Sequence, residues 1–330
     1  MRPRFILAAA AFAAAAYSQT ARLGEIEFFG YSGLDIAAVR KALPVHEGDQ
    51  VSQSQKTVNR VTAAVKRVTG LEPTDVATIC CDNKGGAMIY IGLGKQRGDF
   101  KYNSAPTGTS SFPTNVIKLS DETGKAWMQA VFKGNAGEDD SKGYALSADA
   151  KLRSKQLAMR DYALVHEELI LQVLENSSDA QQRVVASELL GYAQQSGKQI
   201  AALARASHDA NETVRNNAVR ALSVLARSDP RVAAQIPAAE FIPMLHSGTW
   251  TDLNKASLLL EPLSAGRDPK LLGQLREQAQ DALIEMARWR SPGHSYAAKV
   301  ILGRIAGIEE KRLQEIVEKG NVQTILDALK

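Results

Sequence analysis

The chain contains little cysteine, few aromatic residues and almost no excess charge. Its two cysteines are too few for a disulfide framework or a cysteine-based metal site. Aromatic residues make up 6% of the 330 residues, and the formal net charge is +4. Nucleic-acid and membrane-surface binding depend on clustered positive charge, so this balance argues against both. No later segment approaches the about 20 apolar residues that a membrane-spanning helix needs.

The two cysteines are neighbours in the sequence. A disulfide between Cys80 and Cys81 is expected to be strained, because the bond requires a wider separation than adjacent residues provide. We therefore expect at least one of them to be buried as a small hydrophobic residue. Pairing with a partner molecule is the alternative in an oxidising compartment.

The N-terminus has the pattern of a secretory signal. Arg2 and Arg4 precede an apolar run over 5–16, which is too short to span a bilayer. Small residues then predict cleavage between Ser18 and Gln19, which makes residues 1–18 a signal peptide. Cleavage lowers the net charge to +2 and implies a periplasmic or secreted protein. An uncleaved anchor helix is the alternative.

Residues 19–97 are predicted to form a small α/β module with the order β-α-α-β-β. A strand is expected over 23–29 and a short helix after it, which Pro44 stops. Ser52 and Gln55 have the spacing of a capping box and predict the start of a second helix, which Gly70 closes. Strands over 76–81 and 87–93 complete the module, and alternating apolar residues along the last one predict one buried face.

Four pieces of this module resemble a POTRA domain. They are the strand IEFFG, the helix that ends in LPVHEGDQVS, the second helix that ends in Thr69-Gly70, and the hairpin that finishes in AMIYIGLG. POTRA domains are exported modules that bind extended peptides at a free sheet edge. The resemblance therefore implies this mode of binding. An unrelated α/β domain with a covered edge is the alternative.

Residues 98–148 are predicted to be a linker that contains one helix and an acidic loop. The segment 99–111 is rich in Gly, Pro, Ser and Thr, and a helix is expected over 113–132. Glu138, Asp139 and Asp140 lie between glycines and are weak candidates for binding a hard cation such as calcium. The alternatives are a solvated turn or a group that caps a helix.

The range 149–330 is predicted to be an array of helix pairs. A small residue, a leucine four positions later and an apolar residue three further on recur four times, at spacings of 32, 38 and 42 residues. The leucines of this frame are Leu190, Leu222, Leu260 and Leu302. Stacked helix pairs bury such stripes in a continuous core, with a long helix to about 176 as the first layer. Asp179 and Asn211 are placed to cap inner helices.

The segment ASHDANETVRNNAVRALSVLA, residues 206–226, resembles bacterial HEAT repeats, including the kind named after phycobiliprotein lyases. The resemblance implies a curved solenoid that holds proteins, and a few members of that group are enzymes. Arg183, Arg215 and Arg220 are candidates for a partner-binding groove. Pairing of Arg183 and Arg215 with nearby carboxylates such as Asp209, as a structural ladder between layers, is the alternative.

The sequence thus predicts a multidomain chain in which an α+β module precedes an all-α solenoid of about four HEAT-like repeats. The function we expect is that of an exported, non-enzymatic adaptor that binds a protein or peptide and needs no cofactor. The alternative is a HEAT-class lyase or another enzyme that acts on a protein-bound substrate. Its only loose candidates are the three loop carboxylates and His166, since residue 170 of the His166-Glu167 segment is Ile and breaks a zinc-protease motif.

Overall fold

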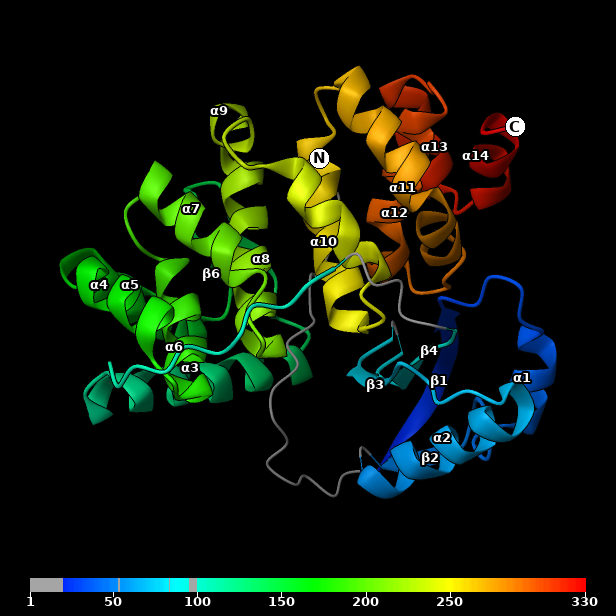
Figure 1. Ribbon diagram of the computed structural model, residues 1–330, viewed down its shortest axis with the longest axis horizontal. Helices are drawn as coiled ribbons and strands as arrows, with labels where there is room; N and C mark the ends of the chain where they lie inside the picture. The colour runs from blue at the N-terminus through cyan, green and yellow to red at the C-terminus, as the bar shows by residue number, and fades with distance from the viewer. Residues whose placement is uncertain (1–19, 53, 83, 95–99) are drawn as a thin grey trace. The chain divides into compact units, whose positions relative to one another are not determined.

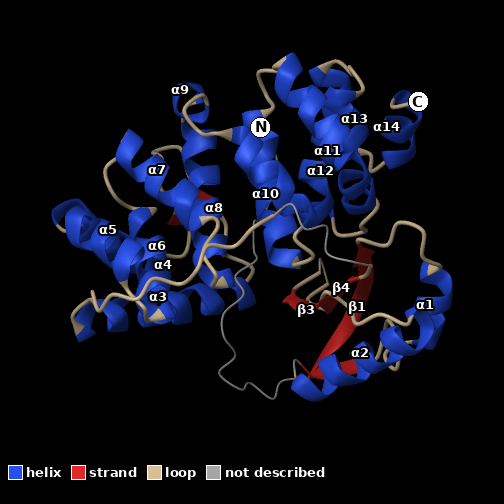
Figure 2. Cartoon of the chain, viewed as in Figure 1, coloured by secondary structure: helices blue, strands red, loops and turns tan. Residues whose placement is uncertain are grey.

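A computed structural model of the protein describes residues 20–330 except 53, 83 and 95–99. The predicted signal peptide and the Ser18–Gln19 cleavage site lie outside the described residues. A small strand-containing module is followed by many helices, which confirms the predicted fold class (Figures 1 and 2). No helix in the part of the chain that is described is long and apolar enough to cross a membrane.

The chain divides into two compact units. The helical unit comprises Lys101–Ala238, and the sheet unit joins Ala11–Phe100 to Ala239–Lys330. The range 149–330, which the sequence predicts to be one helical domain, therefore contributes to both units. The last helices fold with the sheet because they cover its second face.

The sheet unit contains one four-stranded sheet in the order β2-β1-β4-β3. Strands β1 and β4 are parallel, whereas β2 and β3 are antiparallel to their neighbours. Its first elements are β1 Thr20–Phe29, α1 Ile36–Ala42, β2 Gln50–Ser52, α2 Gln55–Thr69, β3 Asp75–Cys80 and β4 Ala87–Gly92. Its later elements are η1 Ala238–His246, α10 Trp250–Leu263, α11 Pro269–Ala287, α12 Pro292–Ile305, α13 Glu310–Glu318 and α14 Val322–Ala328.

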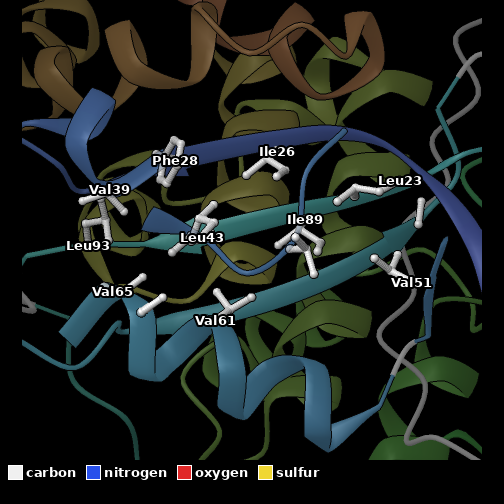
Figure 3. Close-up of a cluster of buried hydrophobic side chains, with 14 residues drawn as sticks. Leu23, Ile26, Phe28, Val39, Leu43, Val51, Val61, Val65, Ile89 and Leu93 are labelled. Carbon is white, nitrogen blue, oxygen red and sulfur yellow. The ribbon is translucent and has the colours of Figure 1, made fainter. Parts of the chain in front are cut away.

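One face of the sheet packs on α1 and α2 (Figure 3). Ile26 and Ile89 lie opposite each other on the parallel strands, and Val61 of α2 packs in the same buried cluster. These side chains are at most 2% exposed. Removal of this apolar surface from water drives the packing of the two layers.

The other face of the sheet packs on aromatic side chains from the C-terminal helices. Tyr90 of β4 is fully buried, and its ring centroid lies 5.0 Å from that of Trp250 and 4.9 Å from that of Trp289. The Tyr90 hydroxyl forms a 2.6 Å hydrogen bond with Nδ1 of His294. Strand β4 is therefore buried on both faces, which corrects the prediction of one buried face. Its sequence AMIYIG contains no charged residue that would favour water.

The turn after β1 is held by α11. Gly30 has a φ of +65°, and a Cβ atom there would lie 2.6 Å from the carbonyl oxygen of Leu93. A side chain would be strained at this position for both reasons. The Gly30 N–H donates to Oε2 of Glu285 at 2.5 Å, and the Tyr31 N–H donates to Oε1 at 3.2 Å.

Helix boundaries in the module follow the predicted signals with one exception. Gly70 has a φ of 73° and closes α2 as expected. The N-cap of α2 is Ser54, whose hydroxyl accepts from the Thr57 N–H, rather than Ser52. Ser52 is the last residue of β2, and its hydroxyl bonds to that of Ser54. The short strand displaced the predicted cap by two residues.

Cys80 and Cys81 are bonded to each other at the end of β3, and both are half-buried. This corrects the expectation that at least one is a buried thiol. The pair lies at the edge of the sheet, where β3 contacts β4 on one side only, so neither residue enters the core.

The helical unit contains seven helices and a short hairpin among its described residues. They are α3 Thr114–Phe132, β5 Glu138–Asp139, β6 Leu146–Ser147, α4 Ala150–Val165, α5 Glu167–Asn176, α6 Ala180–Leu190, α7 Gly197–Ala206, α8 Glu212–Ser228 and α9 Pro230–Ala233. The single helix predicted from 149 to about 176 is two helices. They meet at His166, which has a non-helical φ of −120° and ψ of 26°.

The leucines of the repeat frame are all fully buried, as predicted. They are Leu190, Leu222, Leu260 and Leu302. Leu190 and Leu222 lie on α6 and α8, which contact each other, and the last two lie on the contacting pair α10 and α12. The frame therefore builds two stacks, one in each unit, which corrects the prediction of one continuous core over 149–330. The predicted N-caps Asp179 and Asn211 both accept hydrogen bonds from the first turns of α6 and α8.

Candidate binding surfaces

The acidic loop is bound to the helices of its own unit. Glu138 accepts a 2.7 Å hydrogen bond from Nε2 of Gln156 and forms an ion pair with Arg220. Asp140 pairs with Nε of Arg227 at 2.5 Å. Asp139 accepts from a backbone N–H within the loop. The loop is thus a docked hairpin, and not the solvated turn or cation loop considered from the sequence.

No group of three His, Cys, Asp or Glu side chains among the described residues is arranged to hold a metal ion. The charge of Glu138 raises the pKa of Arg220, so the guanidinium stays charged in the pair. Arg220 is part of the contact that holds the hairpin against α8. It is therefore engaged inside the unit rather than presented to a partner.

Arg183 and Arg215 lie beneath the surface and form the structural ladder. Arg183 is 1% exposed, and it donates to both carboxylate oxygens of Asp209 at 2.8 and 3.0 Å. Arg215 is 3% exposed and donates to the carbonyl oxygen of Asp209 at 3.0 Å. Two donors on one carboxylate fix the spacing of the α6 and α8 layers. The prediction that these two arginines bind a partner is not supported, because their guanidinium groups already donate hydrogen bonds to Asp209 within the helical unit.

Residues 101–111 of the predicted linker form a strap on the helical unit. The Asn103 N–H donates to the carbonyl oxygen of His208 at 2.6 Å, and the ring of Tyr102 lies 4.3 Å below the guanidinium carbon of Arg215. Further along, the Ser178 N–H donates to the carbonyl oxygen of Gly108 at 2.8 Å. The strap therefore covers the loops above the arginine ladder. Its polar composition indicated exposure but did not reveal these backbone partners.

The inner helices of the helical unit are covered by other parts of the same unit. Ser120 of α3 donates to Oε2 of Glu188 on α6 at 2.7 Å. Arg160 of α4 donates to the carbonyl oxygen of Tyr192, and its guanidinium carbon lies 3.8 Å above the ring of Tyr144 in the hairpin. Helix α3 and the hairpin thus cover part of the surface of α6 and α8.

The enzyme alternative gains no site from this arrangement. His166 lies at the junction of α4 and α5, where its ring centroid is 4.3 Å from that of Tyr162. The hairpin carboxylates instead face the arginines of α8. Among the described residues, no hydrogen bond or ion pair joins His166 to these carboxylates, and general acid–base chemistry requires groups within hydrogen-bond reach of one substrate.

The sheet unit has a free strand edge at β3. The Leu93 N–H donates to the carbonyl oxygen of Phe29, so alternate backbone groups of β4 point to β1 and the others point to β3. In the β3–β4 register, Ala77 then faces β4, whereas Val76 and Thr78 direct their N–H and C=O groups away from the sheet. No hydrogen bond within the described residues uses these outward groups.

A small pocket lies at the start of this strand. It encloses about 450 Å³ of empty space, including open solvent, and its lining includes Thr74, Asp281 and Glu285. The Thr74 hydroxyl is buried and has no hydrogen-bond partner in the described structure. Glu285 is already engaged with the turn after β1, and Asp281 lies 3.4 Å from Nε2 of His246. The sequence held no signal for this pocket, because its residues come from five separate segments.

No family model matches the chain, and no curated protein matches it. The solved structures similar to part of it include two designed armadillo repeat proteins. One is a designed armadillo repeat protein in complex with the peptide (KR)4, with 16% identity, a TM-score of 0.38, and coverage of 56% of this chain and 95% of that chain. The other is a second designed armadillo repeat protein, with 16% identity, a TM-score of 0.37, and coverage of 58% and 97%. Both TM-scores are low, so neither likeness identifies a family for this chain.

Proposed function

We propose that this chain is an exported, non-enzymatic scaffold that binds an extended segment of a partner protein along β3. The observation that carries the proposal is the unused row of backbone groups at Val76 and Thr78. An added strand gains affinity from main-chain hydrogen bonds, and side-chain contacts give it specificity. The POTRA resemblance of the module and the HEAT resemblance of 206–226 agree with a binding role in the cell envelope.

The composition of β3 supports this use of its edge. Soluble proteins protect free edges with lysine, proline, bulges or short strands. Strand β3 has six residues, DVATIC, with β-branched side chains and a single charge at its first position. Such an edge favours the addition of another strand.

Proline substitution tests the edge directly. Thr78→Pro removes an N–H that points away from the sheet, so the sheet keeps its own hydrogen bonds while strand addition is blocked. We expect peptides selected from a random library on the wild-type protein to bind the variant about tenfold more weakly or worse. Ala77→Pro is the matched control, because it removes an N–H that pairs with β4 and should lower the stability of the module instead.

The cellular partner is tested with a photo-crosslinking residue placed at position 76 in the full chain. We expect one stoichiometric partner in the envelope fraction, and we expect its yield to fall in the Thr78→Pro background. A partner recovered equally well from that background would remove β3 from the binding site. N-terminal sequencing of the exported protein tests the leader, with Gln19 expected as the first residue.

A further inference from the structure

The charged side chains of helices α1 and α2 are all positive. Neither helix contains an acidic residue, whereas α1 contains two basic residues and α2 contains four. Two of these six pair with carboxylates, since Arg40 binds Glu47 and Lys66 binds Glu72. The other four are exposed and form no ion pair among the described residues. We call these four the basic face: Lys41, Lys56, Arg60 and Arg67.

The basic face lies on the outer side of the helix layer. Figure 3 shows Val61 and Val65 of α2 directed toward the sheet. Lys56, Arg60 and Arg67 lie on the side of α2 that faces away from the sheet, because residues four, seven and eleven positions apart share one helix face. With a rise of about 1.5 Å per residue, these three residues span about 16 Å along the helix.

Two hydrogen bonds hold the arginines of the basic face beside the end of α1. Nη2 of Arg60 donates to the carbonyl oxygen of Pro44 at 3.1 Å, and Nη2 of Arg67 donates to the carbonyl oxygen of Ala42 at 3.4 Å. Each bond uses one of the five N–H donors of a guanidinium group and leaves its charge uncompensated. Lys41 is in the last turn of α1, so the basic face is one patch that extends over both helices.

This arrangement of charge does not stabilise α2. Lys56 and Arg60 are four positions apart and repel each other, and Lys56 lies in the first turn, where a positive charge opposes the helix dipole. The fold therefore gains nothing from concentrating these charges on one side. Uncompensated charges of one sign on one surface attract a partner of the opposite charge.

The shape of the basic face matches a plane rather than a groove. Ala37, Ala38 and Ala63 are exposed and lie among the basic residues on the outer sides of the two helices. Their short side chains leave the lysine and arginine side chains as the groups that project farthest. A flat negative surface therefore reaches all four charges at once, whereas a single acidic peptide would follow only the line of charges along α2.

We propose that the basic face docks the protein on the surface of an anionic lipid bilayer. Each lysine or arginine close to such a surface strengthens the attraction about fivefold, and the four charges act together on one layer of headgroups. The net charge of +4 argues against this binding for the chain as a whole. That sum conceals the separation of basic from acidic residues within the sheet unit, where α1 and α2 hold only basic ones.

Co-sedimentation of the full-length mature protein with lipid vesicles tests the proposal. The vesicles contain equal parts of phosphatidylglycerol and phosphatidylcholine, and vesicles of phosphatidylcholine alone are the neutral reference. We expect binding to the anionic vesicles only, and we expect it to weaken steeply as salt is added, because salt screens the attraction between charges. A variant that combines Lys56→Gln, Arg60→Gln and Arg67→Gln should bind about a hundredfold more weakly.

The matched control removes the same charge at α13 of the same unit. Lys311→Gln, Arg312→Gln and Lys319→Gln change three exposed basic residues that lie among acidic ones, so this combined variant should bind the vesicles like the wild type.

Two further variants separate the effect of charge from any effect on the fold. Arg60→Lys combined with Arg67→Lys keeps both charges and should keep the binding. Lys41→Gln combined with Lys56→Gln breaks no side-chain hydrogen bond among the described residues and should weaken binding about 25-fold. Circular dichroism checks that each variant remains folded.

Three results would overturn the proposal. They are equal binding to anionic and neutral vesicles, a loss of binding in the α13 control as large as that in the basic-face variant, and no binding to anionic vesicles at low salt. Capture of polyglutamate by the basic face without binding to vesicles would assign this face to an acidic protein instead. Thr78→Pro should leave vesicle binding unchanged, so this proposal and strand addition at β3 fail or succeed separately.

Discussion

The two units close their surfaces by different chemistry. In the helical unit, arginines pair with carboxylates and backbone carbonyls, and the chain's own strap and hairpin lie over the inner helices. In the sheet unit, Arg290 and Arg304 also pair with carboxylates, but aromatic rings fill the space between β4 and the C-terminal helices. No hydrogen bond among the described residues uses the outward groups of Val76 and Thr78 on β3. The helical unit pairs these arginines and carboxylates internally, whereas the sheet unit leaves the outward backbone groups of β3 without a hydrogen bond among the described residues.

This difference changes where binding is expected. A helical repeat invites a search along its inner helices, but in this chain that surface already holds a segment of the same polypeptide. A partner would have to displace charge-assisted hydrogen bonds there. At β3 a partner would replace water on backbone groups that make no hydrogen bond among the described residues. The open edge is therefore the easier site, even though the repeat is the more conspicuous feature of the sequence.

Removing the central charge of the helical unit should have the largest effect. Arg183→Ala leaves the Asp209 carboxylate buried without its bidentate partner, and loss of one member of a buried pair costs about 3–5 kcal/mol. We expect a loss of that size in the free energy of unfolding, measured with denaturant. The control is Lys66→Ala, which breaks an exposed pair with Glu72 and should cost less than about 1 kcal/mol.

A companion variant separates charge from packing in the same place. Arg183→Met combined with Asp209→Leu removes both charges and keeps apolar volume, so it should recover most of the lost stability. If the double variant is as unstable as Arg183→Ala, apolar volume cannot replace the ion pair, and the layers depend on the specific hydrogen bonds of Arg183.

The corresponding change in the sheet unit should be smaller. Tyr90→Phe removes only the hydroxyl that bonds to Nδ1 of His294 and keeps the ring against Trp250 and Trp289. A hydrogen bond of this kind contributes about 1–2 kcal/mol. Tyr90→Ala also removes the ring and should cost about 3–5 kcal/mol. Equal losses for the two variants would show that the hydroxyl, and not ring packing, holds the helices on the sheet.

Local and periodic features of this fold were predictable from the sequence. The strand at β1, the caps Asp179 and Asn211, and the buried frame leucines all follow from short-range patterns, and the structure confirms them. The break at His166 was not predictable, because apolar periodicity continues through it. Burial of both faces of β4 depends on helices more than 150 residues later in the chain, which no local pattern specifies.

The binding surfaces were less predictable than the fold. From the sequence, Arg183 and Arg215 could line a charged binding groove. In the structure they instead bind the carboxylate of Asp209 and backbone carbonyl oxygens, which come close to them only when α6 and α8 pack together. The acidic loop likewise resembled a cation site in the sequence, whereas in the structure its carboxylates pair with Arg220 and Arg227. Charged residues of opposite sign, distant in sequence, tend to neutralise each other in the fold. A search for isolated charges overlooks this pairing.

The smallest expected effect concerns pH, and it has opposite signs in the two units. Burial raises the pKa of Glu188 in the helical unit above its ordinary value of 4.5, although the hydrogen bond from Ser120 partly offsets the shift. The folded state then binds a proton more tightly than the unfolded state. Its contribution to stability is complete below the unfolded pKa and is lost as the pH rises through the folded pKa.

In the sheet unit, the hydrogen bond from Arg290 lowers the pKa of Glu47, so its contribution is present above the unfolded pKa and is lost as the pH falls. Hydrogen exchange resolved by unit, measured from neutral to acid pH, should therefore show Glu188→Gln removing a slope in the helical unit alone. Glu47→Gln should remove a slope of opposite sign in the sheet unit alone. If stability changed with pH in the same direction in both units, burial would not be the main influence on the pKa of Glu188. The helical unit would then leave its carboxylates as accessible to water as the sheet unit does.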